Sequence, residues 1–72
     1  MPDVMVLAIE AERVRRGMND AELSRLLGIP VSTWHRTKNG ERRVGIRLLQ
    51  AVARNMPELR DVSRAYLTKE GS

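Results

Sequence analysis

The sequence contains no cysteine and no phenylalanine, and it has a single tryptophan and a single tyrosine. Without cysteine, the chain cannot form a disulfide bond or a thiolate metal site. Its one histidine, His35, cannot build a metal cluster alone. Because aromatic side chains are so scarce, the core must consist of Leu, Val, Ile, Met and Ala. Such a core favours packed helices over a sheet, and we expect an all-α protein without a metal or cofactor.

Long apolar runs are also missing. The longest, from Val4 to Ile9, is far too short to span a bilayer. It has neither the basic leader nor the small-residue cleavage site of a secretory signal. We therefore expect a cytoplasmic protein that does not contact membranes. A chain of 72 residues corresponds to one small domain with a thin core.

The positive charge is concentrated in one part of the chain. Residues 25–54 contain seven basic side chains and one acid, Glu41, which gives this segment a net charge of +6. The remainder has six basic side chains against eight acids, a net charge of −2. A basic half on an otherwise acidic domain is typical of a protein that binds a polyanion. A solvated arginine-rich surface without a partner is the alternative that charge alone leaves open.

Apolar spacing and helix-end signals predict five helices, over residues 3–16, 19–27, 30–39, 46–55 and 57–66. We expect residues 1–67 to form one domain and residues 68–72 to form a disordered tail. In the first helix, Asp3 can cap the amino end and Gly17 supplies the stop. Apolar residues at helical spacing give this helix one stripe, composed of Val4, Leu7, Ala8, Ala11 and Val14.

The second and third predicted helices are joined by a very short turn. Asn19 and Glu22 have the spacing of a capping box, in which each side chain bonds to the backbone of the other residue. Gly28 tolerates the left-handed conformation that a sharp helix stop requires. Pro30 suits the start of the next helix, because it has no amide hydrogen to lose there.

The third predicted helix has one apolar and one polar side. With Trp34 pointing inward and about 100° per residue, Ser32, Arg36 and Asn39 face outward. Thr33 and His35 then lie on the flanks. Lys38 is close to the direction of Trp34, so we expect its stem to pack while its ammonium reaches solvent.

The ordered set of residues around this turn resembles the Cro/repressor family of helix-turn-helix regulators, often called the XRE family. The similarity covers roughly residues 7–56. It depends on Leu23, Ser24, the Leu27-Gly28-Ile29 turn, Ser32, Thr33, Trp34, Arg36, Asn39 and Gly40, and on the basic loop and apolar helix that follow. The resemblance implies a lambda-repressor-like domain of four or five helices that binds operator DNA, commonly as a dimer, with its third helix in the major groove.

The chain departs from the family pattern at three positions. Asp20 replaces a Gln that usually contacts a phosphate, so we expect that contact to be missing. Lys38 replaces an acid that usually pairs with an arginine of the first helix, which implies a charge-swapped ion pair with Glu10 or Glu12. Val31 stands where the family often has a polar base-contacting side chain, so it either touches a thymine methyl group or packs.

The predicted DNA-contacting residues are Val31, Ser32, Thr33, His35, Arg36, Lys38, Asn39, Arg42 and Arg43. Arg36 is the best candidate for base readout, because a guanidinium can donate two hydrogen bonds to guanine. A phosphate contact or plain exposure remains open for it. We expect Asn39, Arg42 and Arg43 to contact phosphates and to set the register. Ser32 could instead cap its helix, and His35 could be an ordinary surface side chain.

The fifth predicted helix has an apolar stripe of Leu59, Val62 and Tyr66. This stripe either closes the core over the fourth helix or forms a two-fold dimer surface, and both can hold. A dimer would bring two recognition helices to half-sites about one helical turn apart, as in a palindromic operator.

The leading hypothesis is a sequence-specific transcriptional regulator of double-stranded DNA, either a Cro-like repressor or a controller protein. One alternative is a protein-interaction module, antiactivator-like or antitoxin-like, that keeps the fold without reading DNA. Another is an architectural DNA-binding protein that bends its site. The sequence contains no Ser/His/acid set, phosphate-binding glycine loop or paired carboxylates that would indicate an enzyme. We expect no small-molecule ligand.

Overall fold

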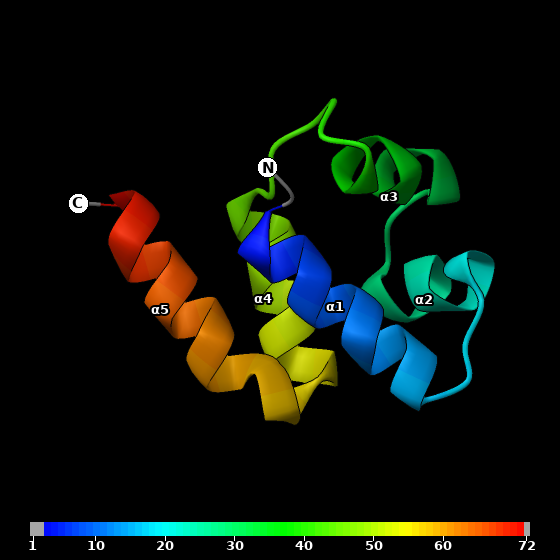
Figure 1. The fold of residues 1–72 in the computed structure, drawn as a ribbon, viewed down its shortest axis with the longest axis horizontal. Coiled ribbons are helices and arrows are strands. Elements are labelled where there is room, and N and C mark those ends of the chain that lie inside the picture. Colours follow the sequence, from blue (N-terminus) through cyan, green and yellow to red (C-terminus); the bar gives the residue numbers. More distant parts are fainter. Residues whose placement is uncertain (1–2, 72) are drawn as a thin grey trace.

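The computed structural model describes residues 3–71, and the side chains of residues 3–68. Five α-helices follow one another: α1 (Val4–Arg15), α2 (Asp20–Leu27), α3 (Val31–Lys38), α4 (Ile46–Asn55) and α5 (Arg60–Gly71). A short 3₁₀ turn, η1 (Pro57–Leu59), precedes α5. Figure 1 shows α1 in front of α4, with α2 and α3 at one end of the molecule and α5 at the other. The described residues contain no strand, which confirms the all-α prediction.

The sharp turns between helices form at the predicted residues. Asn19 and Glu22 make both hydrogen bonds of the capping box at the start of α2. Gly28 ends α2 with a φ of 70°, a left-handed conformation that favours glycine. Pro30 is the residue before the first turn of α3, with an extended backbone. These signals are local, and the structure confirms each of them.

The core lies where α1, α2, α3 and α4 meet. Its fully buried side chains are Met5, Ile9, Leu23, Trp34, Val52 and Met56. Trp34 is the largest of them and is 0% exposed. Because it belongs to α3, its burial fixes the side of α3 that faces the protein.

Of the apolar stripe predicted for the first helix, Ala8 packs against this core, but most of the stripe does not face it. Val4, Leu7 and Val14 are exposed, whereas Met5 and Ile9 are fully buried. The helix has apolar residues on two sides, so periodicity alone did not identify the buried one. The prediction of the helix was correct, and the implied role of this stripe was wrong.

The buried side of α1 is hard to recognise in the sequence, because it includes an acidic residue. Glu12 is 5% exposed, and its carboxylate accepts hydrogen bonds from Arg15 and Arg16. The same two guanidinium groups also bind Glu58, with nitrogen–oxygen distances of 2.7 and 3.2 Å. The hydrogen bonds from Arg15 and then Arg16 lower the pKa of Glu12 to about 2. This cluster connects the end of α1 to the turn before α5.

The last helix is longer than the sequence predicts. It continues to Gly71, through most of the segment assigned to a disordered tail from residue 68. No proline or glycine interrupts it before Gly71, and the Thr68 hydroxyl donates to the carbonyl of Arg64 at 3.0 Å. Ser72 lies outside the described residues.

The predicted dimer stripe of α5 and η1 is divided between core and surface. Leu59 and Tyr66 are half-buried and pack against the core. The Tyr66 hydroxyl also donates to Asp3 Oδ2 at 2.7 Å, which fastens α5 to the start of α1. Val62 is 38% exposed. Leu59 and Tyr66 therefore act in closing the core, which was one of the two interpretations of this stripe.

The Glu12 cluster predicts an acid-sensitive fold. Because its pKa is lowered in the folded state, Glu12 stabilises the fold above the ordinary pKa of a glutamate, near 4.5, and this contribution is lost as the pH falls toward 2. We expect the free energy of unfolding to fall over that range, and Glu12→Gln to make it less pH-dependent. Urea unfolding at several pH values, followed by Trp34 fluorescence, measures both. Equal pH dependence in the two proteins would contradict the role of Glu12.

Candidate nucleic-acid interface

The outer side of α3 is polar and open to solvent. Ser32 and Arg36 are exposed, as is Asn39 at the end of the helix, while Trp34 on the opposite side is fully buried. Figure 1 places α3 at the edge of the molecule, where no other helix covers this side. The predicted orientation of α3 is confirmed. An exposed α-helix of this size fits the major groove of DNA.

Asp20, at the start of α2, holds the buried tryptophan in place. The indole Nε1 of Trp34 donates to Asp20 Oδ1 at 2.9 Å. A buried N–H without a partner would destabilise the fold, so this acceptor allows the ring to be fully enclosed. Asp20 was expected to lack the family's phosphate contact, and its bond to Trp34 could not be inferred from the sequence.

Lys38 is bound on the inner side of α3, between two carboxylates. Its ammonium lies 2.9 Å from Asp20 Oδ2 and 2.9 Å from Glu10 Oε1. The hydrogen bonds to Asp20 and Glu10 raise the pKa of Lys38. The charge-swapped ion pair with Glu10 is therefore confirmed, and Glu12 is not the partner. The ammonium was expected to reach solvent, and the structure instead directs it toward α1 and α2.

The two carboxylates that hold Lys38 are ionised more readily than usual. The hydrogen bond from Lys38 lowers the pKa of Asp20, and the bond from Trp34 adds to it against the effect of burial. Burial would raise the pKa of Glu10, but the hydrogen bonds from Lys38 and Arg13 outweigh it and lower that pKa. The carboxylates of Asp20 and Glu10 are thus paired with cations within the fold.

The remaining predicted side chains of α3 lie at its flanks. Val31 and His35 are exposed, and Thr33 is half-buried. The His35 Nε2 atom is 3.4 Å from Asp20 Oδ2. His35 thus lies next to the carboxylate that also binds Trp34 and Lys38.

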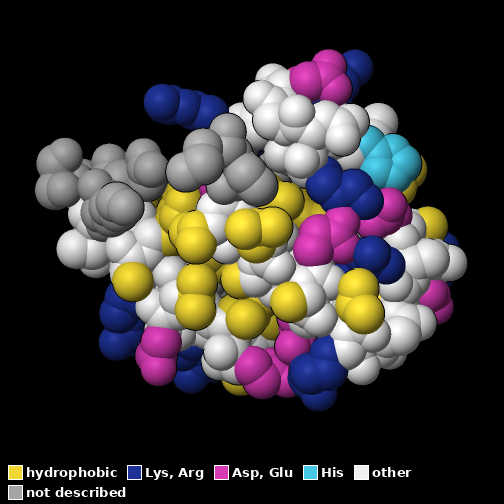
Figure 2. Space-filling view, viewed as in Figure 1, with side chains coloured by type: hydrophobic (Ala, Val, Ile, Leu, Met, Phe, Trp, Pro, Cys, Tyr) yellow, Lys and Arg dark blue, Asp and Glu magenta, His cyan; other side chains and the backbone are white. Residues whose placement is uncertain are grey.

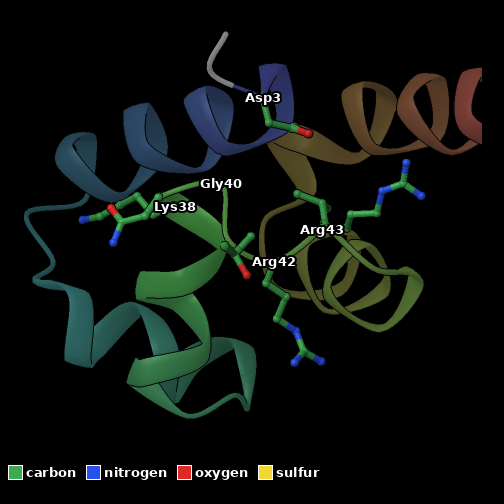
Figure 3. Close-up of a pocket in the computed structure, with 8 residues that line it drawn as sticks. Asp3, Lys38, Gly40, Arg42 and Arg43 are labelled. Atoms are coloured by element: carbon green, nitrogen blue, oxygen red, sulfur yellow. The ribbon is translucent and has the colours of Figure 1, made fainter.

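The loop after α3 carries two more of the predicted cations. Gly40 has a φ of 83°, and the amides of Glu41 and Arg42 then bond back to the carbonyl of Arg36, at 2.8 and 3.3 Å. These bonds hold the loop against the end of α3. Arg42 and Arg43 are exposed and point in different directions from the loop, beside a hollow of about 460 Å³ whose far side includes Asp3 (Figure 3).

Arg47 belongs to the same basic surface, although it was not among the predicted contacts. It is exposed on the first turn of α4. With Arg42 and Arg43 it borders a second hollow, of about 230 Å³, which reaches Pro30 and Thr33 on the α3 side. Its place in the basic segment of residues 25–54 was the signal that could have identified it.

Residues 3–71 show neither a metal-binding cluster nor a membrane-spanning helix. In that range no three His, Cys, Asp or Glu side chains come together in a way that could hold a metal ion. The helices of the same range are too short or too polar to cross a membrane.

The contact between Trp34 and Asp20 can be tested by its effect on stability. Asp20→Ala leaves the buried indole N–H without an acceptor, and we expect it to lower the free energy of unfolding by about 1–3 kcal/mol. Asp20→Asn keeps an acceptor oxygen and should cost less. Glu41→Ala, at an exposed loop residue, should change stability by less than about 0.5 kcal/mol. Chemical denaturation measures all three, and unchanged stability of Asp20→Ala would contradict the assignment.

Comparison with known proteins agrees with this geometry. No curated protein and no solved structure matches the chain. The family described as the Cro/C1-type HTH DNA-binding domain matches residues 10–66, which include α2, α3 and the basic loop. That family is defined by DNA binding and is not a family of enzymes. The match covers most of the chain, and this protein therefore belongs to the Cro/C1-type helix-turn-helix DNA-binding family.

Proposed function

We propose that this protein is a sequence-specific transcriptional regulator that reads operator DNA with α3. The observation that carries the proposal is the orientation of α3. Its apolar side is fixed by the fully buried Trp34, and its opposite side presents Ser32, Arg36 and Asn39 to solvent. Because the chain belongs to a DNA-binding family, DNA is the ligand that we propose for this surface. The basic side chains beside α3 attract the DNA phosphates.

The proposed roles follow from chemistry and position. Arg36 lies at the centre of the outer side and donates to guanine in the major groove. Ser32, Thr33 and His35 bond to neighbouring bases or phosphates, and Val31 contacts a thymine methyl group.

Phosphate contacts surround this central group. Asn39, Arg42 and Arg43 were predicted for that role, and the exposed Arg47 joins them. Lys38 is left out of the proposed interface, because its ammonium is already bound by Glu10 and Asp20.

Regulation by this protein acts through occupancy of its operator. Two copies on a palindromic site would place two α3 helices in successive major grooves on one face of the duplex. We therefore propose a homodimer on DNA, acting in the cytoplasm where the nucleoid lies, as a repressor of the Cro type.

One argument for the alternative, a protein-interaction module that does not read DNA, is removed by the position of Asp20 in the fold. The carboxylate of Asp20 is an argument for that alternative, because it stands where the family usually contacts a phosphate and a carboxylate repels phosphate. In the fold this carboxylate bonds to Trp34 and Lys38 and is neutralised there. The bonds from Asp20 to Trp34 and Lys38 hold α3 in place. This structural role explains why an acid stands here, and Asp20 is therefore no argument against DNA binding.

Substitution of single arginines distinguishes base readout from phosphate contact. We expect Arg36→Ala to relax the preference at one base pair and to cost about 1–3 kcal/mol there. Arg43→Ala should weaken binding to all sequences alike and reduce the salt slope by about 1. Selection from a random duplex library, followed by titrations at several salt concentrations, measures both effects.

Arg64→Ala is the matched control for this experiment. Arg64 is equally exposed but lies on α5, at the other end of the molecule from α3 (Figure 1). Its removal should leave sequence preference unchanged. If Arg36→Ala lowered affinity uniformly, Arg36 would be a phosphate contact. If wild type selected no sequence at all, the proposed function would be wrong.

A further inference from the structure

A groove of about 250 Å³ lies between α4 and α5. Its walls are mostly apolar: Ile46, Leu49 and Ala53 come from α4, and Leu67 comes from α5. Ile46 is 56% exposed and Leu67 is 43% exposed, so both side chains are open to an apolar ligand. In the described part of the chain none of the proposed DNA contacts lines the groove, and α5 lies at the opposite end of the molecule from α3 (Figure 1). The groove and the candidate DNA interface can therefore be occupied at once.

Ser63 gives this groove a polar group without a partner. The residue lines the groove and is 4% exposed, and its Oγ atom forms no hydrogen bond within the described part of the chain. Three other helical hydroxyls, those of Ser24, Thr37 and Thr68, each donate to the carbonyl four residues earlier. A buried hydroxyl without a partner lowers the stability of the fold. A ligand atom that accepts a hydrogen bond in the groove would remove that cost.

The charged side chains that line the groove are both cationic. Arg60 and Arg64 are exposed, lie one turn apart on α5, and form no ion pair within residues 3–68. The remaining polar side chain of the lining, Gln50, is neutral. Figure 2 shows Lys and Arg side chains along the lower left edge of the molecule, where α5 lies in Figure 1. The groove therefore favours an anion over a cation.

The groove has the volume of a small molecule. A water molecule occupies about 30 Å³ in the liquid, so roughly eight non-hydrogen atoms fill a groove of this size. A helix of a partner protein is about 10 Å across and would insert only single side chains. A free small molecule can fill the groove completely, and we therefore favour it over a protein segment.

We propose that the groove binds a small carboxylic acid with a short apolar chain. The chain of the acid packs between Ile46 and Leu67. Its carboxylate accepts hydrogen bonds from Ser63 and from the guanidinium groups of Arg60 and Arg64, and so supplies the partner that the buried hydroxyl lacks. This ligand departs from the expectation, drawn from the sequence, that the chain binds no small molecule. The proposal is independent of the proposed function, because binding can be measured without DNA.

Hexanoate, which matches the groove in size, is the probe for this site. Titration of the isotope-labelled full chain at neutral pH, followed by its backbone amide resonances, measures binding. We expect saturable shifts centred on residues 46–53 and 60–67, with a dissociation constant on the order of 1 mM. Hexanamide has the same size without the charge, and it should bind about fivefold more weakly or worse.

Three variants separate the named contacts from a general effect of charge. Ser63→Ala should weaken hexanoate binding about tenfold, and its stability should not fall, because it removes a buried hydroxyl that has no partner. Arg60→Gln should weaken binding about threefold. Arg54→Gln is the matched control: Arg54 is exposed on α4 and does not line the groove, and this variant should bind hexanoate as wild type does. Circular dichroism checks that all three variants keep the helix content of wild type.

The absence of saturable shifts in those two segments at about 20 mM hexanoate would overturn the proposal. Equal affinity for hexanamide would also overturn it, as would a loss in Arg54→Gln as large as that in Arg60→Gln. The other occupant to test is a second copy of the chain, by sedimentation equilibrium. A dimer that Leu67→Glu dissociates and hexanoate does not would contradict the proposal, because a second copy would then fill the groove.

Discussion

The hydrogen bond from the Trp34 indole to Asp20 determines how α3 lies on the rest of the molecule. Burying the ring provides the apolar contact, and the carboxylate satisfies its only polar atom. Asp20 also binds Lys38, which reaches Glu10 on α1, so three helices are joined at one point. With one side of α3 held in this way, the residues on the opposite side must face solvent.

The ion pairs divide the molecule into a part whose charges are paired and a part with exposed cations. On α1, Arg15 and Arg16 are bound by Glu12 and Glu58, and Arg13 is bound by Glu10. Around α3 and its loop, Arg36, Arg42, Arg43 and Arg47 are exposed and form no ion pair within the described part of the chain. The fold therefore pairs Glu10, Glu12 and Glu58 with the arginines of the first helix and leaves Arg36, Arg42, Arg43 and Arg47 available for an external polyanion.

Features encoded by neighbouring residues could be predicted from the sequence, and those that depend on distant residues could not. The capping box at Asn19, the left-handed Gly28 and the inward Trp34 all follow from local spacing, and each is confirmed. The buried side of α1 could not be chosen, because both sides are apolar and the buried one includes Glu12. The roles of Asp20 and Tyr66 depend on partners 14 and 63 residues away.

The central claim is that the outer side of α3 and the loop behind it meet DNA. The most direct measurement is a titration of the isotope-labelled protein with duplex DNA, followed by the backbone amide resonances. We predict that the largest chemical-shift changes fall on residues 31–47, with small changes along the carboxyl half of α5. Changes concentrated on α5 and the core-facing side of α1, with residues 31–43 unaffected, would contradict the account.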